Sequence, residues 1–312
     1  MKKLLIGVSG VMIIGLILAM IQYETQFQTT PLELNPTEKH QLNQEPPQPD
    51  PLQPILIDDS IGYSLQNNQV NLTYDQGGNW LQVPIEKSDL FNGEYQGSEQ
   101  ELIDDSFILT EDKLGFLYLD GEDTDMKQII FMYSLDQGET WEKTIVMDQI
   151  PSLRYRKVAF LDEDFGYIII SADRTMSQEY STVFLTHDGG ESWEEANHSE
   201  VMTLIAGGGF IDEDTGFLSY GTINPEEPTL YVTQDGGKSW DESQVSMPAK
   251  YDHVFVIAET PVKEGDHLAV LINQGPNGDY EGGQVKGKFI SKDNGLTWQF
   301  LEESNPNEEE TD

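Results

Sequence analysis

Carboxylates are the most abundant side chains in this chain that could do chemistry. The sequence holds 56 Asp and Glu residues against 17 Lys and Arg, a formal net charge of −39 at pH 7. Glycoside hydrolysis needs two carboxyl groups about 5–10 Å apart across a sugar, and among so many acids some pair meets that distance by chance. Spacing in the sequence therefore leaves hydrolysis open. The same charge repels nucleic-acid phosphates, so nucleic-acid binding is excluded.

Other reactive groups are scattered along the chain. The five histidines do not follow the spacing of metal ligands, and we interpret them as surface residues. They are His40, His187, His198, His253 and His267. No serine elbow, phosphate loop or dinucleotide motif is present, so we expect no metal and no cofactor. The chain has no cysteine, which excludes disulfides and a lipid-modified cysteine.

The elements that must position any site are marked by an eight-residue pattern, Ser/Thr-x-Asp-x-Gly-x-x-Trp, which occurs five times. The copies span residues 73–80, 134–141, 186–193, 233–240 and 291–298. Their defining residues are Asp75, Gly77 and Trp80; Asp136, Gly138 and Trp141; Asp188, Gly190 and Trp193; Asp235, Gly237 and Trp240; and Asp293, Gly295 and Trp298. Every tryptophan of the chain ends a copy, which indicates a repeated structural role.

Each copy has the chemistry of a β-hairpin turn. The Asp carboxylate can fold back onto backbone N–H groups, and the Gly supplies a positive φ that a side chain would resist. The Trp opens the next strand and can lie over the turn. Calcium ligation is the weaker interpretation, because each copy offers one carboxylate where calcium sites usually recruit several.

A second repeat precedes four of the five copies. It consists of an apolar residue, one or two acids and a Gly-aromatic pair, at residues 57–63, 109–116, 160–167 and 210–217; residues 262–266 stand in its place in the fifth unit. Each unit then comprises four strands (A to D), with the acidic turn between A and B and the eight-residue turn between C and D. The units run from about Leu52–Ile85, Ser106–Met147, Tyr155–His198, Met202–Val245 and His253–Glu302. This repetition predicts an all-β fold, a β-propeller with five four-stranded blades. A degenerate sixth blade at residues 86–105 stays open, although that stretch is short.

The eight-residue turn resembles the Asp-box, or bacterial neuraminidase (BNR) repeat. With the acidic turn it is similar to the propellers of photosystem II assembly factors and of the wider sialidase-like superfamily, over about Leu52–Glu302. The resemblance implies a fold but no activity, because such propellers serve sialidases, xyloglucanases, sorting receptors and non-enzymatic assembly factors. Sialidases grip a carboxylate with three arginines from separate blades and use a Tyr/Glu pair and an Asp acid. Here the only three arginines fall in one unit and no Phe/Tyr-Arg-Ile-Pro stretch occurs, so sialidase activity is not expected.

Those three arginines, Arg154, Arg156 and Arg174, fall in the third unit at the end opposite the eight-residue turns. Arg154 and Arg156 alternate and can point the same way from one strand, forming with Arg174 a cationic spot for a carboxylate-bearing partner or glycan. The plainer interpretation, which we favour, is that they neutralise local acids such as Asp173 and Glu179.

Two long loops share that end of the predicted blades. Residues 86–105 carry Tyr95 and residues 273–287 carry Tyr280. Binding sites commonly lie on long loops held by a rigid scaffold, so we add both tyrosines to the predicted binding residues.

The termini differ from the repeats in composition. Lysines within residues 1–3 precede an uncharged, mostly apolar run at 4–21 that is long enough for one transmembrane helix. We expect a signal anchor with the N-terminus in the cytoplasm and the propeller outside; the alternative is a cleaved signal peptide and secretion. Residues 22–54, rich in Gln and Pro, predict a semi-rigid linker, residues 55–302 the propeller, and residues 303–312 a disordered acidic tail.

These features together predict a membrane-anchored, extracytoplasmic propeller that binds a protein or a cell-envelope glycan and is not an enzyme. The alternative is a cell-surface glycan-processing hydrolase of the sialidase-like superfamily. A hydrolase should show paired carboxylates with a perturbed pKa at the mouth of the propeller channel, whereas a binding module should show a wide apolar or charged patch without such a pair. A third possibility, a purely structural spacer in the cell envelope, predicts neither feature.

Overall fold

The computed structural model describes residues 51–94, 97–121, 126–175 and 178–305. The predicted anchor at 4–21, most of the linker, Tyr95 and most of the acidic tail lie outside the described residues. The described part is all-β, as the repeats predict, and none of its helices is long and apolar enough to cross a membrane. Its helical segments are α3 (Lys87–Leu90) and the 3₁₀ turns η1 (Gln66–Asn68), η2 (Ala249–Tyr251) and η3 (Tyr280–Gly282).

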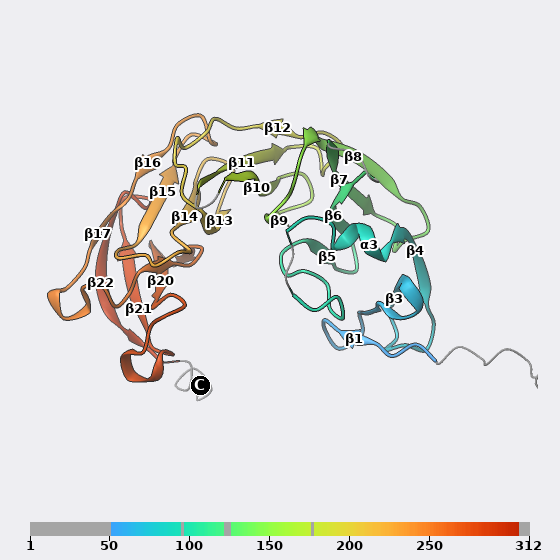
Figure 1. The fold of residues 1–312 in the computed structure, drawn as a ribbon, viewed down its shortest axis with the longest axis horizontal. Coiled ribbons are helices and arrows are strands. Elements are labelled where there is room, and N and C mark those ends of the chain that lie inside the picture. The colour runs from blue at the N-terminus through green and yellow to red at the C-terminus, as the bar shows by residue number, and fades with distance from the viewer. Residues whose placement is uncertain (1–50, 95–96, 122–125, 176–177, 306–312) are drawn as a thin grey trace, which may run out of the picture. The chain divides into compact units, whose positions relative to one another are not determined.

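Four antiparallel sheets have four strands each, paired in sequence order. The first contains β1 (Ile55–Leu56), β2 (Gly62–Ser64), β3 (Gln69–Thr73) and β4 (Leu81–Glu86); the second contains β5 (Phe107–Leu109), β6 (Leu114–Asp120), β7 (Lys127–Ser134) and β8 (Glu142–Ile150). The third contains β9 (Tyr155–Phe160), β10 (Gly166–Thr175), β11 (Gln178–Thr186) and β12 (Glu194–Glu195); the fourth contains β13 (Ile205–Phe210), β14 (Gly216–Tyr220), β15 (Thr229–Thr233) and β16 (Asp241–Glu242). The sheets follow one another along the chain from blue to orange in Figure 1.

The fifth sheet has six strands, so the prediction of four in every unit was wrong there. It consists of β17 (Gln244–Ser246), β18 (Ile257–Ala258), β19 (Val262–Glu264), β20 (His267–Asn273), β21 (Lys286–Ser291) and β22 (Thr297–Ser304). Both β18 and β19 pair with β20. They are two separate strands because Pro261, which lies between them, has no N–H to donate to the ladder. The sixth strand, β17, belongs to the crossing from the fourth sheet and pairs in parallel with β22.

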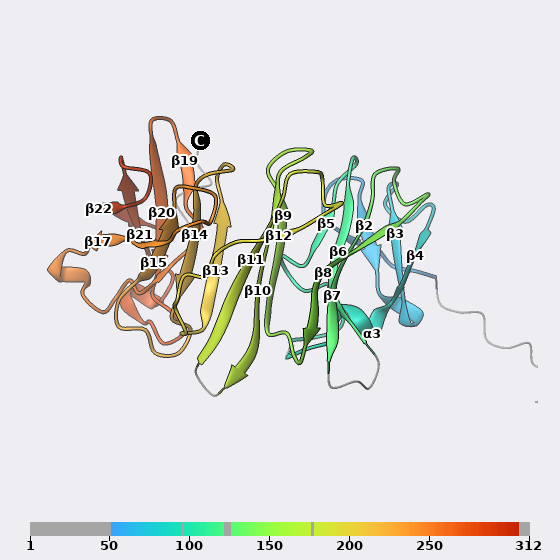
Figure 2. The ribbon, with the colours of Figure 1, turned by 90° about the horizontal axis from the view of Figure 1, so that it is seen from above.

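Antiparallel pairing sorts the connections between strands into two ends. The Asp-x-Gly turns and the acidic turns share one end, which we call the box end. The connections from β2 to β3, β6 to β7, β10 to β11, β14 to β15 and β20 to β21 share the other, which we call the loop end. The strands run up and down the view of Figure 2, and α3 lies near its lower edge, at the loop end.

The hydrophobic core consists of four clusters, each between consecutive sheets. Phe116 packs with Leu72 between the first and second sheets, and Phe131 with Ile168 between the second and third. Equivalent clusters join the third sheet to the fourth and the fourth to the fifth. None of the four combines residues of the first and fifth sheets, and no strand pair links those two sheets within the described residues.

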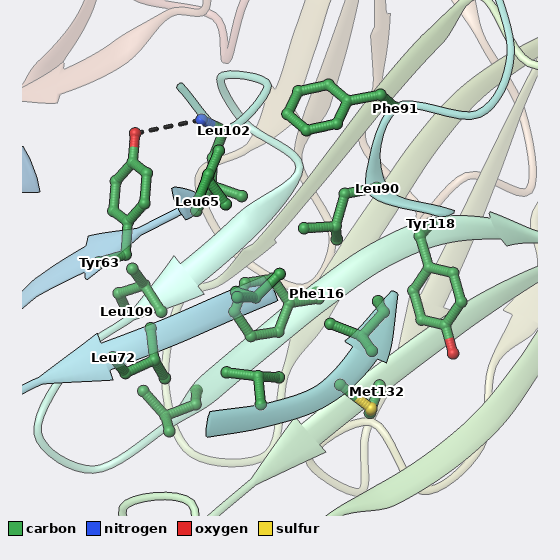
Figure 3. Close-up of a cluster of buried hydrophobic side chains, with 14 of the residues drawn as sticks. Tyr63, Leu65, Leu72, Leu90, Phe91, Leu102, Leu109, Phe116, Tyr118 and Met132 are labelled. Carbon is green, nitrogen blue, oxygen red and sulfur yellow. Dashed lines mark hydrogen bonds between the residues drawn. The ribbon is translucent and has the colours of Figure 1, made fainter. Parts of the chain in front are cut away.

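The segment after β4 belongs partly to this core. Leu90, Phe91 and Leu102 are buried in the first cluster, where the Leu102 N–H donates to the Tyr63 hydroxyl at 3.1 Å (Figure 3). This stretch contains α3 but no strand in its described part. Leu90, Phe91 and Leu102 of the loop that the sequence offered as a binding loop are therefore packed against the first two sheets, whereas residues 97–101 are exposed.

Candidate functional site

The eight-residue turns fold around their Asp carboxylates. In the second copy the Ser134 hydroxyl donates to Asp136 Oδ1 at 2.7 Å and accepts from the Gly138 N–H at 2.8 Å. The Thr140 N–H donates to the same Oδ1 at 2.9 Å and its hydroxyl to Oδ2 at 2.6 Å. All five copies repeat this set of bonds. Both carboxylate oxygens thus accept hydrogen bonds from residues of the same turn.

One partner in this network was missed from the sequence. The residue before each Trp donates a side-chain hydrogen bond to Asp Oδ2; these residues are Asn79, Thr140, Ser192, Ser239 and Thr297. Each is a small side chain with a hydrogen-bond donor. That common property is the signal that could have identified them.

The turns also join neighbouring sheets. The Thr144 hydroxyl donates to the Gly190 carbonyl at 3.1 Å, and the Ser243 hydroxyl to the Gly295 carbonyl at 2.6 Å. In each case a residue that follows one turn in the sequence donates to the glycine carbonyl of the next turn. The box end is therefore held by structural contacts.

Acid should weaken the fold through these turns. Hydrogen bonds, first from the Thr140 side chain, lower the pKa of Asp136 from 3.8 to about 2. A pKa lowered by folding gives a stabilisation that is present above the unfolded value and lost as the pH falls through the folded value. The unfolding free energy of the wild type should therefore fall between about pH 4 and pH 2, and that of Asp136→Asn should fall less. Urea unfolding at several pH values in this range measures the unfolding free energy of both proteins. An equal fall in the wild type and in Asp136→Asn would contradict the prediction. The fall for Thr140→Ala should lie between those two.

Arg154 forms a buried ion pair. Its Nε donates to Glu179 Oε2 at 2.6 Å, a second nitrogen binds Glu179 Oε1, and the same nitrogen donates to the Ile205 carbonyl at 2.8 Å. The Glu179 side chain is fully buried and also accepts the Ile205 N–H at 2.9 Å. The pair therefore connects the third sheet to β13 of the fourth.

Arg156 and Arg174 contact the segment after α3 instead. Arg156 is buried and donates to the carbonyls of Leu90 and Asn92, and burial lowers its pKa to about 10. A nitrogen of Arg174 lies 3.6 Å from a carboxylate oxygen of Glu94. The three guanidinium groups therefore bind different partners: Arg154 binds Glu179 and Ile205, whereas Arg156 and Arg174 bind residues 90–94.

Tyr280 lies at the loop end in a cluster that the sequence did not reveal. Its hydroxyl donates to Glu303 Oε1 at 2.9 Å, and the Lys250 ammonium donates to the same oxygen at 2.9 Å. The Tyr251 hydroxyl donates to it as well. These bonds, first that of Tyr251, lower the pKa of Glu303 to about 2, and Glu303 in turn raises the pKa of Tyr251. The partners come from the η2, η3 and β22 segments, which are too far apart in sequence to predict the contact.

Beside this cluster the loop end holds a cavity of about 360 Å³, which we call the loop pocket. Three segments line it: residues 224–226 after β14, residues 253–256 before β18, and residues 274–280 after β20. Asn277 Nδ2 donates to Asn224 Oδ1 at 2.9 Å, and His253 Nδ1 lies 3.0 Å from the Glu226 carbonyl oxygen. These contacts tie each of the other two segments to residues 224–226.

The backbone of the loop pocket is also unusual. Asn224 and His253 have φ angles of 45° and 58°, in the left-handed region that side chains disfavour. Residues held in this region persist where their surroundings fix them, and they are frequent at ligand sites.

A separate cavity of about 380 Å³ on the fifth sheet is lined by Lys288 and Glu264, which pair with each other at 2.9 Å. The loop pocket is the better candidate site.

Comparison with known families identifies the repeat. Residues 132–143 match the model of the BNR/Asp-box repeat. The repeated turn is an Asp-box. The prediction of an Asp-box repeat is thereby confirmed for residues 132–143, and the other four copies of the turn repeat its hydrogen bonds.

Solved structures similar to this Asp-box chain include both binding proteins and hydrolases. YCF48 bound to a D1 peptide is 14% identical over 81% of this chain and 82% of that one, with a TM-score of 0.42. The family GH43 β-xylosidase/α-arabinofuranosidase CoXyl43, from a compost metagenome and in complex with xylotriose, is 11% identical over 64% and 77%, with a TM-score of 0.39. A protein of unknown function from Dyadobacter fermentans is 10% identical over 82% and 72%, with a TM-score of 0.40. No curated protein matches the chain.

Proposed function

We propose that this chain is a non-enzymatic binding module that holds a protein or glycan partner at the loop pocket. The observation that carries the proposal is the cavity itself, built from three segments that hydrogen bonds tie to one another. A concave site with a few fixed polar groups on a rigid scaffold is the usual form of a ligand site. We further propose that residues 4–21 anchor the chain in the membrane and that the linker presents the pocket outside the cytoplasm.

A hydrolase of the sialidase-like superfamily is the alternative, and the cluster around Glu303 bears on it. A tyrosine nucleophile would need a neighbouring base and an accessible phenolate. Tyr251 does contact a carboxylate, but that contact raises its pKa, which disfavours the phenolate. The Asp and Glu residues with a resolved shift, such as Asp136 and Glu303, have lowered pKa values, the opposite of the raised pKa that a general acid needs. Both observations support binding over catalysis.

Filling the loop pocket should weaken partner binding. Pro276 lines the pocket and is exposed, so Pro276→Trp adds a large side chain to the cavity without disturbing the core. We expect the full-length variant to bind at least about tenfold more weakly than the wild type, since a blocked hot-spot pocket typically costs 2 kcal/mol or more. Pull-downs on cell-envelope polysaccharides and solubilised membrane proteins, followed by titration of the partner recovered, measure this.

Pro151→Trp is the matched control. Pro151 is exposed after β8 at the same end but does not line the pocket, so this variant should bind like the wild type. Binding that survives Pro276→Trp would move the site elsewhere. Release of a cleaved sugar from any polysaccharide would overturn the non-enzymatic proposal.

A further inference from the structure

We infer that the loop pocket takes a basic side chain, a lysine or arginine of a partner peptide; this inference rests on the proposed function. The charged residues among the pocket's twelve lining residues are Glu226 and Asp279, with no lysine or arginine. Both residues are exposed, and their carboxylates can accept charge-assisted hydrogen bonds from an ammonium or guanidinium group.

Part of the remaining lining suits the stem of such a side chain. Pro225, Val254, Val256 and Pro276 supply apolar surface inside the same cavity. Lysine and arginine commonly bury their methylene stems against apolar surface while the charged head reaches polar groups. A pocket that combines four apolar residues with two acidic ones therefore matches both parts of a basic side chain.

The chain's own Lys250 shows that the surface beside the pocket accepts an ammonium group. Its Nζ lies 4.7 Å from the centroid of the Tyr251 ring and 5.8 Å from that of Tyr280, and it donates to Glu303 at 2.9 Å. Tyr280 also lines the pocket. An aromatic ring with a nearby carboxylate is thus already used for an internal cation, and Lys250 itself does not line the cavity.

General attraction to a chain of net charge −39 must be separated from binding in the pocket. The probe is a fluorescein-labelled peptide, Ala-Lys-Ala-Lys-Ala, titrated against the full-length chain by fluorescence anisotropy at 0.15 M salt. Its neutral counterpart carries Nε-acetyl groups on both lysines. The pocket variant is Glu226→Gln/Asp279→Asn, and the control Glu213→Gln/Asp214→Asn removes the same two charges from exposed residues at the box end.

We expect the pocket variant to bind the lysine peptide at least about tenfold more weakly than the wild type, because charge-assisted hydrogen bonds are lost. The control variant should stay within about twofold, and the acetylated peptide should bind as weakly to the wild type as the lysine peptide binds to the pocket variant. Equal losses in the two variants would overturn the inference, because they would show general attraction only. Tight binding of the acetylated peptide would overturn it as well.

Failure of this inference is distinguishable from failure of the proposed function. If Pro276→Trp abolishes binding of a partner while Glu226→Gln/Asp279→Asn leaves it unchanged, the pocket binds a neutral ligand such as a glycan, and only the basic side chain is refuted. If neither variant changes binding of that partner, the pocket is not the binding site, and both proposals fall.

Discussion

Replacing Arg154 by alanine is expected to destabilise the fold by about 3–5 kcal/mol, the typical cost of removing one partner from a buried ion pair. The variant leaves the fully buried Glu179 carboxylate with the Ile205 N–H at 2.9 Å but without its guanidinium. An unpaired carboxylate in the protein interior is costly because it has lost its hydration and found no counter-charge. Urea unfolding at pH 7 measures the change in the unfolding free energy.

Two further variants define the control for Arg154. Arg154→Met/Glu179→Leu removes both charges and should recover much of the lost stability, because an apolar pair of similar size needs no counter-charge. Lys157→Ala breaks a pair with Asp105, whose side chain is 55% exposed and 3.5 Å away, and should cost about 1 kcal/mol or less. A cost for Arg154→Ala as small as that of Lys157→Ala would show that the buried pair contributes little.

Replacing Trp298 by alanine should also cost about 3–5 kcal/mol, as for large buried aromatic residues in general. Trp298 is fully buried, whereas the tryptophans of the other four Asp-boxes are only partly buried. The difference arises from β17, in which Val245 pairs with Trp298 in the parallel register and packs on the same cluster. The indole Nε1 also donates to the Gly295 carbonyl at 3.0 Å.

Trp80→Ala is the matched comparison, since Trp80 occupies the same position of the first Asp-box and is partly exposed. Its cost should be no more than about half that of Trp298→Ala, because less apolar surface is returned to water. Denaturant midpoints of the two variants measure this difference. Equal costs would mean that the ring's contact with its own turn, rather than burial by β17, determines its contribution.

The repeats made the fold predictable because their determinants are local. Asp136, Gly138 and their equivalents specify a turn within eight residues, and the spacing of the turns specifies the strands between them. The sixth strand of the fifth sheet was not predictable, because Gln244–Ser246 carries no pattern of its own and pairs with residues more than fifty positions away. Pro261 was a visible signal for the split inner strand.

The candidate site was predicted less well because its contacts are distant in sequence. Arg156 reaches carbonyls 64 and 66 residues away, and Arg154 reaches Glu179 25 residues away. Alternation in the sequence placed the two arginines on one side of a strand but could not show which partners they would find. Tyr280 was correctly assigned to a long loop at the end opposite the Asp-boxes, whereas the pocket beside it required three segments to come together.

The four separate core clusters have a consequence for how stability is distributed. Within the described residues, each core cluster joins two consecutive sheets. We therefore expect the free energy of unfolding to be approximately a sum of contributions from single units and from pairs of neighbouring units. The terminal units have one such neighbour in these clusters and should open first in native-state hydrogen exchange. The loop pocket is lined by residues of the fourth and fifth units. A ligand that binds both units would therefore stabilise the fifth unit against opening.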